Sequence, residues 1–183
     1  MIEDLIRRRR SVYPKQYNDK PVEKEVVERL LQAAVHAPTH KRTEPWRFKV
    51  VRGASRRRLG EFLQRKYLET ETSPKQFKAK KLLENPMKAG AVIGICMQRD
   101  PQERLPEWEE IAATAMAVQN MWLTCTELGL GGYWSSPGLI RYMDEFFDLA
   151  EGERCLGFFY LGYYDQAVEE VPRLDVESRT EWL

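Results

Sequence analysis

The chain has 183 residues, 43% of them hydrophobic, which is enough for one domain or one two-lobed unit with a sizeable core. Its 29 Lys and Arg residues nearly balance its 28 Asp and Glu residues, so the net charge is +1. Proteins that bind nucleic acid usually carry a clear basic excess, so this balance argues against a general nucleic-acid-binding surface. The longest nearly apolar run, residues 89–97, is much shorter than the ~20 residues of a membrane-spanning helix. We therefore expect a soluble, cytoplasmic protein.

Two helices are predicted at the start of the chain. The first covers residues 2–10 and ends near Ser11, where four consecutive arginines give way to a proline-containing loop over residues 11–21. The second covers residues 23–35, with acidic residues early, where they favour the helix dipole. Its apolar face has helical spacing and consists of Val26, Val27, Leu30, Leu31 and Ala34.

The middle of the chain alternates strands and helices. A turn-rich loop with two prolines, residues 36–45, precedes the alternating, β-prone strand 46–51. Residues 54–68 and 75–84 are highly charged and are predicted to be helical. The apolar run 89–98 is typical of a strand that is buried on both faces.

The longest predicted helix covers residues 107–128. It is apolar nearly all round from Ile111 to Cys125, so we expect it to run through the core, and Gly129 ends it. The remaining predicted elements are a glycine-rich strand, a helix, a β-prone strand and a charged, extended tail, over residues 131–136, 140–149, 154–164 and 165–183. This mixed order predicts an α+β fold rather than a regular βαβ winding.

The three cysteines, Cys96, Cys125 and Cys155, are far apart and lie in apolar runs. None has the spacing of a metal-binding or redox pair, so we interpret them as buried free thiols in a reducing compartment.

Arg9, Arg10 and Ser11 form the first candidate site. Cations in the last turn of a helix stabilise it by ~0.3–1 kcal/mol, and that effect alone could account for them. Alternatively, guanidinium groups and a hydroxyl that converge where the helix ends could hold a phosphate.

The only two histidines, His36 and His40, form the second candidate site. Their i, i+4 spacing suits a metal on a helix, but Pro38 lies between them and no third ligand is nearby, which argues against a metal. Two histidines in one loop could instead donate hydrogen bonds to a ligand.

The glycines of LGLGGYWSS, residues 128–136, form the third candidate site. Gly129, Gly131 and Gly132 could let the backbone approach a flat ligand, or they could simply end a helix before an aromatic strand. Neither nucleotide-binding glycine motif is present. Glu109 and Glu110 open the long predicted helix and are interpreted as partners of its dipole.

Taken together, the chain resembles the nitroreductase family of FMN-dependent oxidoreductases, and within it the short, minimal members. Four segments carry the resemblance in the order of the family: RRSVY, LLQAAVHAPTHKRTEPWRFKVV, AATAMAVQNMWLTCTELGLGGYW and LGFFYLGYY. They span almost the whole chain. Each motif is weak alone, and their joint order and spacing are specific.

The resemblance implies a fold and an assembly. The fold would be the nitroreductase-like α+β fold, with a central mixed, mainly antiparallel sheet flanked by helices in a single domain over residues 1–183. The protein would be an intertwined homodimer with two FMN molecules between the subunits. The tail, residues 165–183, would pack on the partner subunit.

The resemblance also implies which residues bind FMN. Arg9, Arg10 and Ser11 would hold the phosphate and ribityl end from one chain, and Arg173 is a further phosphate candidate.

The flavin ring would have its own contacts. His36 and His40 would reach it from the other chain, while Trp134, Ser135 and Ser136 would lie along it. No catalytic side chain and no metal are implied.

One departure from the family concerns charge near the flavin. The family commonly has a basic residue two positions after the serine, near the N1–O2 edge of the flavin, and this chain has Tyr13 there. Positive charge at that edge would stabilise the reduced flavin, and Lys41 could substitute for the missing group.

The implied activity is hydride transfer from NAD(P)H, followed by reduction of an electron-poor acceptor such as a nitroaromatic or a quinone in a ping-pong mechanism. An alternative is a non-catalytic flavin- or nucleotide-binding dimer. A third possibility is that the arginine run binds nucleic acid or an acidic partner, which would make binding steeply salt-dependent.

Overall fold

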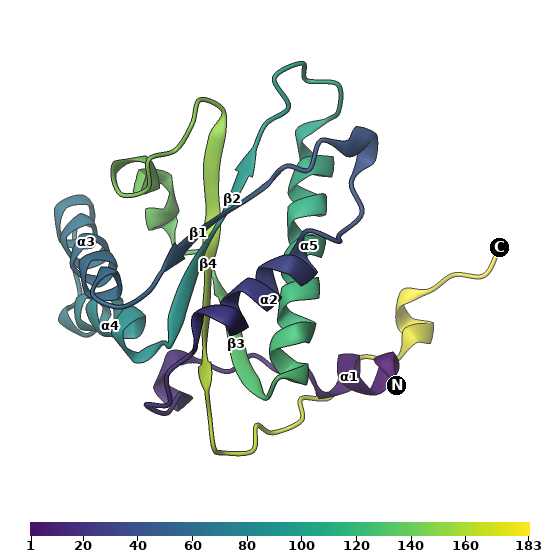
Figure 1. Ribbon diagram of the computed structural model, residues 1–183, viewed down its shortest axis with the longest axis horizontal. Helices are drawn as coiled ribbons and strands as arrows, with labels where there is room; N and C mark the ends of the chain where they lie inside the picture. The colour runs from purple at the N-terminus through teal and green to yellow at the C-terminus, as the bar shows by residue number, and fades with distance from the viewer.

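A four-stranded antiparallel sheet forms the centre of the computed structural model, which describes residues 1–183 (Figure 1). The strands lie in the order β1-β2-β4-β3. Their bounds are Trp46–Val51 for β1, Ala91–Gln98 for β2, Leu130–Ser135 for β3 and Glu153–Tyr163 for β4. All three ladders are antiparallel, and the single parallel pairing is an isolated bridge between Ser11 and Gly132. The α+β class expected from the sequence is confirmed.

Helices cover both faces of this sheet, which explains why its central strands are almost entirely apolar. One face carries α2 (Lys24–Ala34) and α5 (Glu107–Glu127), and the other carries α3 (Ser55–Thr70) and α4 (Gln76–Lys88). The short helix α1 (Ile2–Arg8) lies at the C-terminal end of α5 (Figure 1). No helix is long and apolar enough to cross a membrane.

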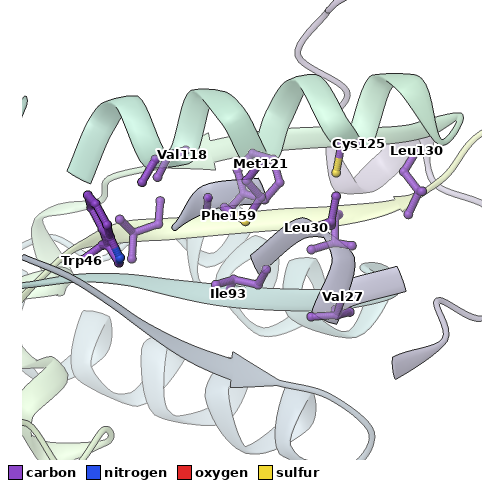
Figure 2. Close-up of a cluster of buried hydrophobic side chains, with 14 of the residues drawn as sticks. Val27, Leu30, Trp46, Ile93, Val118, Met121, Cys125, Leu130 and Phe159 are labelled. Carbon is purple, nitrogen blue, oxygen red and sulfur yellow. The ribbon is translucent and has the colours of Figure 1, made fainter. Parts of the chain in front are cut away.

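The core between α2, α5 and the sheet is the larger of two buried clusters (Figure 2). Leu30, Ile93, Met121 and Phe159 have no exposed surface and come from four different elements. Burying each such side chain contributes about 1.5–3 kcal/mol. This cluster therefore holds α5 firmly against the sheet, and the two ends of α5 position the candidate site residues.

The second core packs α3 and α4 against the opposite face of the sheet. The two helices approach closely because Gly60 has no side chain: a Cβ atom there would lie 2.3 Å from the Leu83 carbonyl oxygen. The thiols of Cys96 and Cys155 lie in this cluster, and Cys125 lies in the first. All three are free and buried, as the sequence indicated.

Helix α5 differs from its prediction on one face. Ala117, Met121 and Cys125 are buried against the sheet, but the opposite face is open and also apolar. Trp108 is 66% exposed and Met116 is 41% exposed. The helix therefore does not run through the core of this chain, because no other element of the chain covers its second apolar face.

Two C-terminal segments complete the fold. The helix predicted over residues 140–149 is a 3-10 helix, η3, over Gly138–Glu145. The apolar spacing is similar for the two helix types in so short a segment, so the sequence could not separate them. Residues 165–183 are extended except for the turn η4 (Val176–Arg179) and include no buried residue, and the C-terminal end of this segment projects away from the body (Figure 1).

Candidate functional site

The backbone of residues 9–12 is held against the edge of the sheet. Helix α1 ends at Arg8, and Arg9 adopts an extended conformation with φ −59° and ψ 125°. The Val12 amide then donates a hydrogen bond of 3.0 Å to the Gly132 carbonyl. A Cβ on Gly131 would lie 2.5 Å from the Cβ of Val12, so this approach requires glycine. Gly131 thus admits the chain's own N-terminal segment, a Cβ on Gly132 would lie 2.4 Å from the ring of Phe159, and Gly129, with φ +72°, ends α5 as expected.

The arginines beside this segment line a cleft of about 920 Å³, which we call the arginine cleft. Its other wall is the first part of the tail, which folds back so that Arg173 lies near Arg9. The lining residues come from two segments about 150 positions apart in the sequence. They are Arg9, Arg10, Ser11, Tyr13, Lys15, Gln16, Tyr17, Asn18, Asp165, Gln166, Ala167, Val168, Glu169, Val171 and Arg173.

Positive charge in the arginine cleft is incompletely compensated. Burial lowers the pKa of the Arg9 guanidinium from its ordinary value, and the charges of Arg173 and Arg10 lower it further. Arg10 has one carboxylate partner, the exposed Glu170, at 3.3 Å. The Nε atom of Arg10 is buried and has no hydrogen-bond partner. An unpaired buried donor among three guanidinium groups fits an anion with several acceptor oxygens.

Trp122 of α5 fixes the position of the two arginines. Its ring lies 4.6 Å from the Arg9 guanidinium, and its Nε1–H donates a hydrogen bond of 3.3 Å to the Arg10 carbonyl. This contact was not predicted from the sequence, because Trp122 lies 112 residues away from Arg10.

His40 lies at the opposite end of α5. Its Nδ1 is 2.7 Å from the Oε2 atom of Glu109, in the first turn of the helix. The surrounding loop is strained, because Lys41, Arg42 and Glu44 all have positive φ angles of 42–54°. Such conformations in non-glycine residues persist where surrounding structure enforces them, and they are concentrated at functional sites.

The two histidines do not converge in this chain. His36 follows α2 and is exposed, with its Nε2 atom 3.4 Å from the Gln32 amide nitrogen. It lies beside Asn120 and Leu123 of α5, about 16 Å along the helix from Glu109 at 1.5 Å per residue. No group of three or more potential metal ligands occurs in the structure, so nothing supports the metal alternative.

The arginine cleft and His40 are likewise separated within one chain. They contact α5 at Trp122 and Glu109, positions that are about 20 Å apart along the helix. Figure 1 shows α1 at one end of α5 and the loop after α2 at the other. A single chain therefore does not assemble all the residues that the sequence indicated.

Trp134, Ser135 and Ser136 lie at the end of β3, about 10 Å along the strand from the Ser11 bridge. The indole of Trp134 covers Gly157 of β4, where a Cβ would lie 2.2 Å from the indole nitrogen. All three residues retain exposed surface. They form a rigid rim on the same edge strand as the arginine cleft.

Glu109 and Glu110 lie in the first turn of α5, where they favour the helix dipole as expected, and each also has a specific side-chain partner. Buried Glu110 accepts hydrogen bonds from the Arg99 guanidinium and from the Asp100 amide at 3.0 Å. The Arg104 guanidinium, 2.8 Å from Asp100, holds the pKa of that carboxyl at about 2. The Lys41 ammonium donates a hydrogen bond of 3.0 Å to the Arg104 carbonyl. This bond links the strained loop to the cluster of Arg99, Asp100, Arg104 and Glu110 and stabilises the loop.

Comparisons with known proteins agree with the observed fold. The model of the nitroreductase family matches residues 6–163. YfhC of Bacillus subtilis, provisionally named as an NAD(P)H nitroreductase, is 31% identical over 98% of this chain and 92% of its own length. The crystal structure of a nitroreductase-like protein from Bacillus cereus has a TM-score of 0.87 at 32% identity and covers 100% of this chain and 96% of its own.

More distant structures share the fold alone. A nitroreductase-type protein of Desulfovibrio desulfuricans, crystallised in complex with FMN, has a TM-score of 0.72 at 23% identity and covers 100% of this chain and 96% of its own. The segment that matches the nitroreductase family model, residues 6–163, includes Arg9–Ser11, the strained loop, α5 and the sheet. On this evidence, the chain belongs to the nitroreductase family.

Proposed function

We propose that this protein is an FMN-dependent oxidoreductase that takes hydride from NAD(P)H and reduces electron-poor acceptors such as nitroaromatics or quinones. The observation that carries the proposal is the arginine cleft, with its clustered positive charge and the unpaired Nε of Arg10. Its volume of about 920 Å³ is within the range of cofactor sites. FMN carries a phosphate that suits the guanidinium groups and a flat ring that suits the rim of β3.

The phosphate end would be bound by Arg9, Arg10 and Ser11, with Arg173 completing the charge from the tail. Arg10 Nε would donate to a phosphate oxygen and so lose its unsatisfied state. Lys15 also lines the cleft and adds a fourth cation. The flavin ring would extend along β3 towards Trp134, Ser135 and Ser136.

The second set of contacts would come from another copy of the chain. If two α5 helices pack antiparallel about an axis near Ala115 and Met116, position 109 of one copy lies opposite position 122 of the other. That arrangement brings His40, which Glu109 holds, towards the arginine cleft around Trp122 of the other subunit. It would also bury the open apolar face of α5, which supports a homodimer. His36 lies beside Asn120 and Leu123, so the same packing would place it opposite residues 108–111 of the other copy, away from that copy's arginine cleft.

The tail gives independent support for a dimer. Val171, Leu174, Val176, Trp182 and Leu183 are each more than 60% exposed in the single chain. Large apolar side chains on an extended segment gain stability only when something covers them. We propose that residues 165–183 pack on the partner subunit and that the chain, a single domain over residues 1–183, forms an intertwined homodimer.

Bound FMN would supply the redox chemistry, namely hydride uptake from NAD(P)H and two-electron reduction of the acceptor. The residues of the chain hold the phosphate, orient the ring and leave one face open. Because donor and acceptor would use the same face in turn, ping-pong kinetics are expected. The three buried free thiols are consistent with a reducing, cytoplasmic location.

The test is to purify the protein and record its absorption spectrum. A yellow protein with the bands of oxidised flavin, bleached by NADPH without acceptor and restored by menadione, would support the proposal. A bound flavin that NADPH does not bleach would instead favour a non-catalytic flavin-binding dimer, an alternative that Tyr13 motivates because it replaces a basic residue common in the family. A colourless monomer that does not bind FMN in titration would contradict both.

A further inference from the structure

The ion pair between His40 and Glu109 lies beside an apolar cavity that is separate from the arginine cleft. The cavity has a volume of about 380 Å³, near the lower end of the range for small-molecule sites. It is lined by Pro38, Thr39, His40, Trp108, Glu109, Ala112, Ala113 and Met116. Apart from the histidine, the carboxylate and one hydroxyl, its walls are hydrocarbon, indole and thioether.

The geometry fixes which nitrogen of His40 carries the proton. An ionised carboxylate can only accept a hydrogen bond, so at 2.7 Å the Nδ1–H of His40 donates to Glu109. The Nε2 atom is then the free end of the ring, and 59% of the side chain is exposed. Glu109 therefore orients the imidazole.

The neighbouring charges leave Glu109 as the partner of His40. Glu107 pairs with Arg154 at 3.1 Å, and buried Glu110 pairs with Arg99. The Lys41 ammonium is held by a backbone carbonyl at 3.0 Å. Glu107, Glu110 and Lys41 are thus engaged elsewhere, while His40 and Glu109 face each other at the cavity.

We propose that His40, oriented by Glu109, donates a proton from Nε2 to an oxygen atom of an aromatic acceptor that packs against Trp108. This inference rests on the proposed function, because the acceptor must also contact the flavin bound with the other subunit. His40 is the proton donor and Glu109 is a positioning residue. Flat aromatic molecules suit this cavity, since the exposed indole of Trp108 makes favourable contacts with aromatic rings.

The proton balance defines the substrate class. A quinone that becomes a hydroquinone gains two electrons and two protons. A hydride brings two electrons and one proton, so a second proton must come from another donor. The Nε2–H of protonated His40 supplies it, and the ring is reprotonated from water. Ferricyanide accepts single electrons and no proton, so its reduction does not need this donor.

A first experiment needs neither flavin nor turnover. The protein has only two histidines, so the ¹⁵N shifts of both rings can be assigned by NMR at a pH where the rings are neutral. We expect His40 to carry its proton on Nδ1 in the wild type and to change to the Nε2–H tautomer in Glu109→Ala. His36 should not change, and Glu107→Ala, which removes the same charge from the same turn, should leave both rings unchanged. An Nε2–H tautomer of neutral His40 in the wild type would overturn the assignment.

A second experiment measures the ratio of menadione turnover to ferricyanide turnover in the flavin-loaded protein. In Glu109→Ala we expect this ratio to fall about tenfold. This loss is smaller than the loss usually seen when a proton donor is removed, because His40 itself remains. Glu109→Asp should recover part of the loss, and Glu107→Ala should keep the wild-type ratio. Equal losses with both acceptors would show a merely structural role and refute the inference. Absence of bound flavin in the wild type would instead refute the proposed function, which distinguishes the two failures.

Discussion

Replacing Arg10 with alanine tests the arginine cleft most directly. In the free protein the side chain makes hydrogen bonds to the carbonyls of Arg7 and Arg9 and an ion pair with Glu170, but its buried Nε is unpaired. The carbonyl of Arg10 accepts the bond from Trp122, and alanine retains that carbonyl. Arg10→Ala should therefore remove the proposed hydrogen-bond donor to the phosphate while leaving the backbone in place.

The expected loss follows from one charge-assisted hydrogen bond. Such a bond contributes about 1.5–3 kcal/mol. Because 1.4 kcal/mol is a factor of ten in affinity, the Kd for FMN should rise roughly 10- to 150-fold. The exposed ion pair with Glu170 should contribute little to this change, since solvent screens exposed pairs.

The assay is a titration of the apoprotein with FMN and, separately, with riboflavin, followed by quenching of flavin fluorescence. Riboflavin lacks the phosphate, so its affinity should be nearly equal in the wild type and in Arg10→Ala. The matched control is Arg8→Ala, because Arg8 belongs to the same arginine run but pairs with Asp4 and Glu127. It does not line the cleft.

Two results would refute the reasoning. One is an equal loss of FMN affinity in Arg10→Ala and Arg8→Ala, which would indicate a diffuse electrostatic effect. The other is an equal loss for riboflavin and FMN in Arg10→Ala, which would show that this side chain does not contact the phosphate.

Three further predictions concern the core, the acid stability and a glycine contact. The side chain of Met121 has no exposed surface, so Met121→Ala should lower the free energy of unfolding, measured by denaturant titration, by about 2–5 kcal/mol. Met116 lies on the open face of α5, so Met116→Ala should mainly weaken self-association, measured by sedimentation. Asp100 has a pKa of about 2 against an ordinary 3.8, so its carboxylate stabilises the fold above about pH 4 and loses that effect as the pH falls towards 2. Asp100→Asn should therefore flatten the dependence of the unfolding free energy on pH between about 4 and 2. An unchanged dependence would contradict the ion pair between Asp100 and Arg104. Gly131→Ala places a Cβ 2.5 Å from the nearest side-chain atom and should weaken FMN binding, whereas Gly138→Ala, with nothing within 4 Å, should not.

Local patterns predicted most of the secondary structure. The apolar periodicity of residues 23–35 and 107–128 predicted α2 and α5 to within about one residue at each end. The apolar run 89–98 predicted the central strand β2, and the order of motifs predicted the family. These features depend on neighbours along the chain, which a sequence shows directly.

The limits of the sequence are clearest along α5. Its composition, apolar on nearly every side, could not show that one apolar face would stay open, because burial depends on which elements reach the helix. The contact between His40 and Glu109 joins residues 69 positions apart, and the return of Arg173 to Arg9 joins residues 164 positions apart. No local pattern encodes such pairs.

The sequence by itself therefore determined the helices and strands, the family and the residue types available for an anion. Only the tertiary structure decided which of these residues meet. The separation of about 20 Å between Trp122 and Glu109 comes from the rise of one helix, and it places the arginine cleft and His40 at opposite ends of α5. Distances of this kind are set by the packing of α5 on the sheet, and that packing arises from contacts among segments that are remote in the chain.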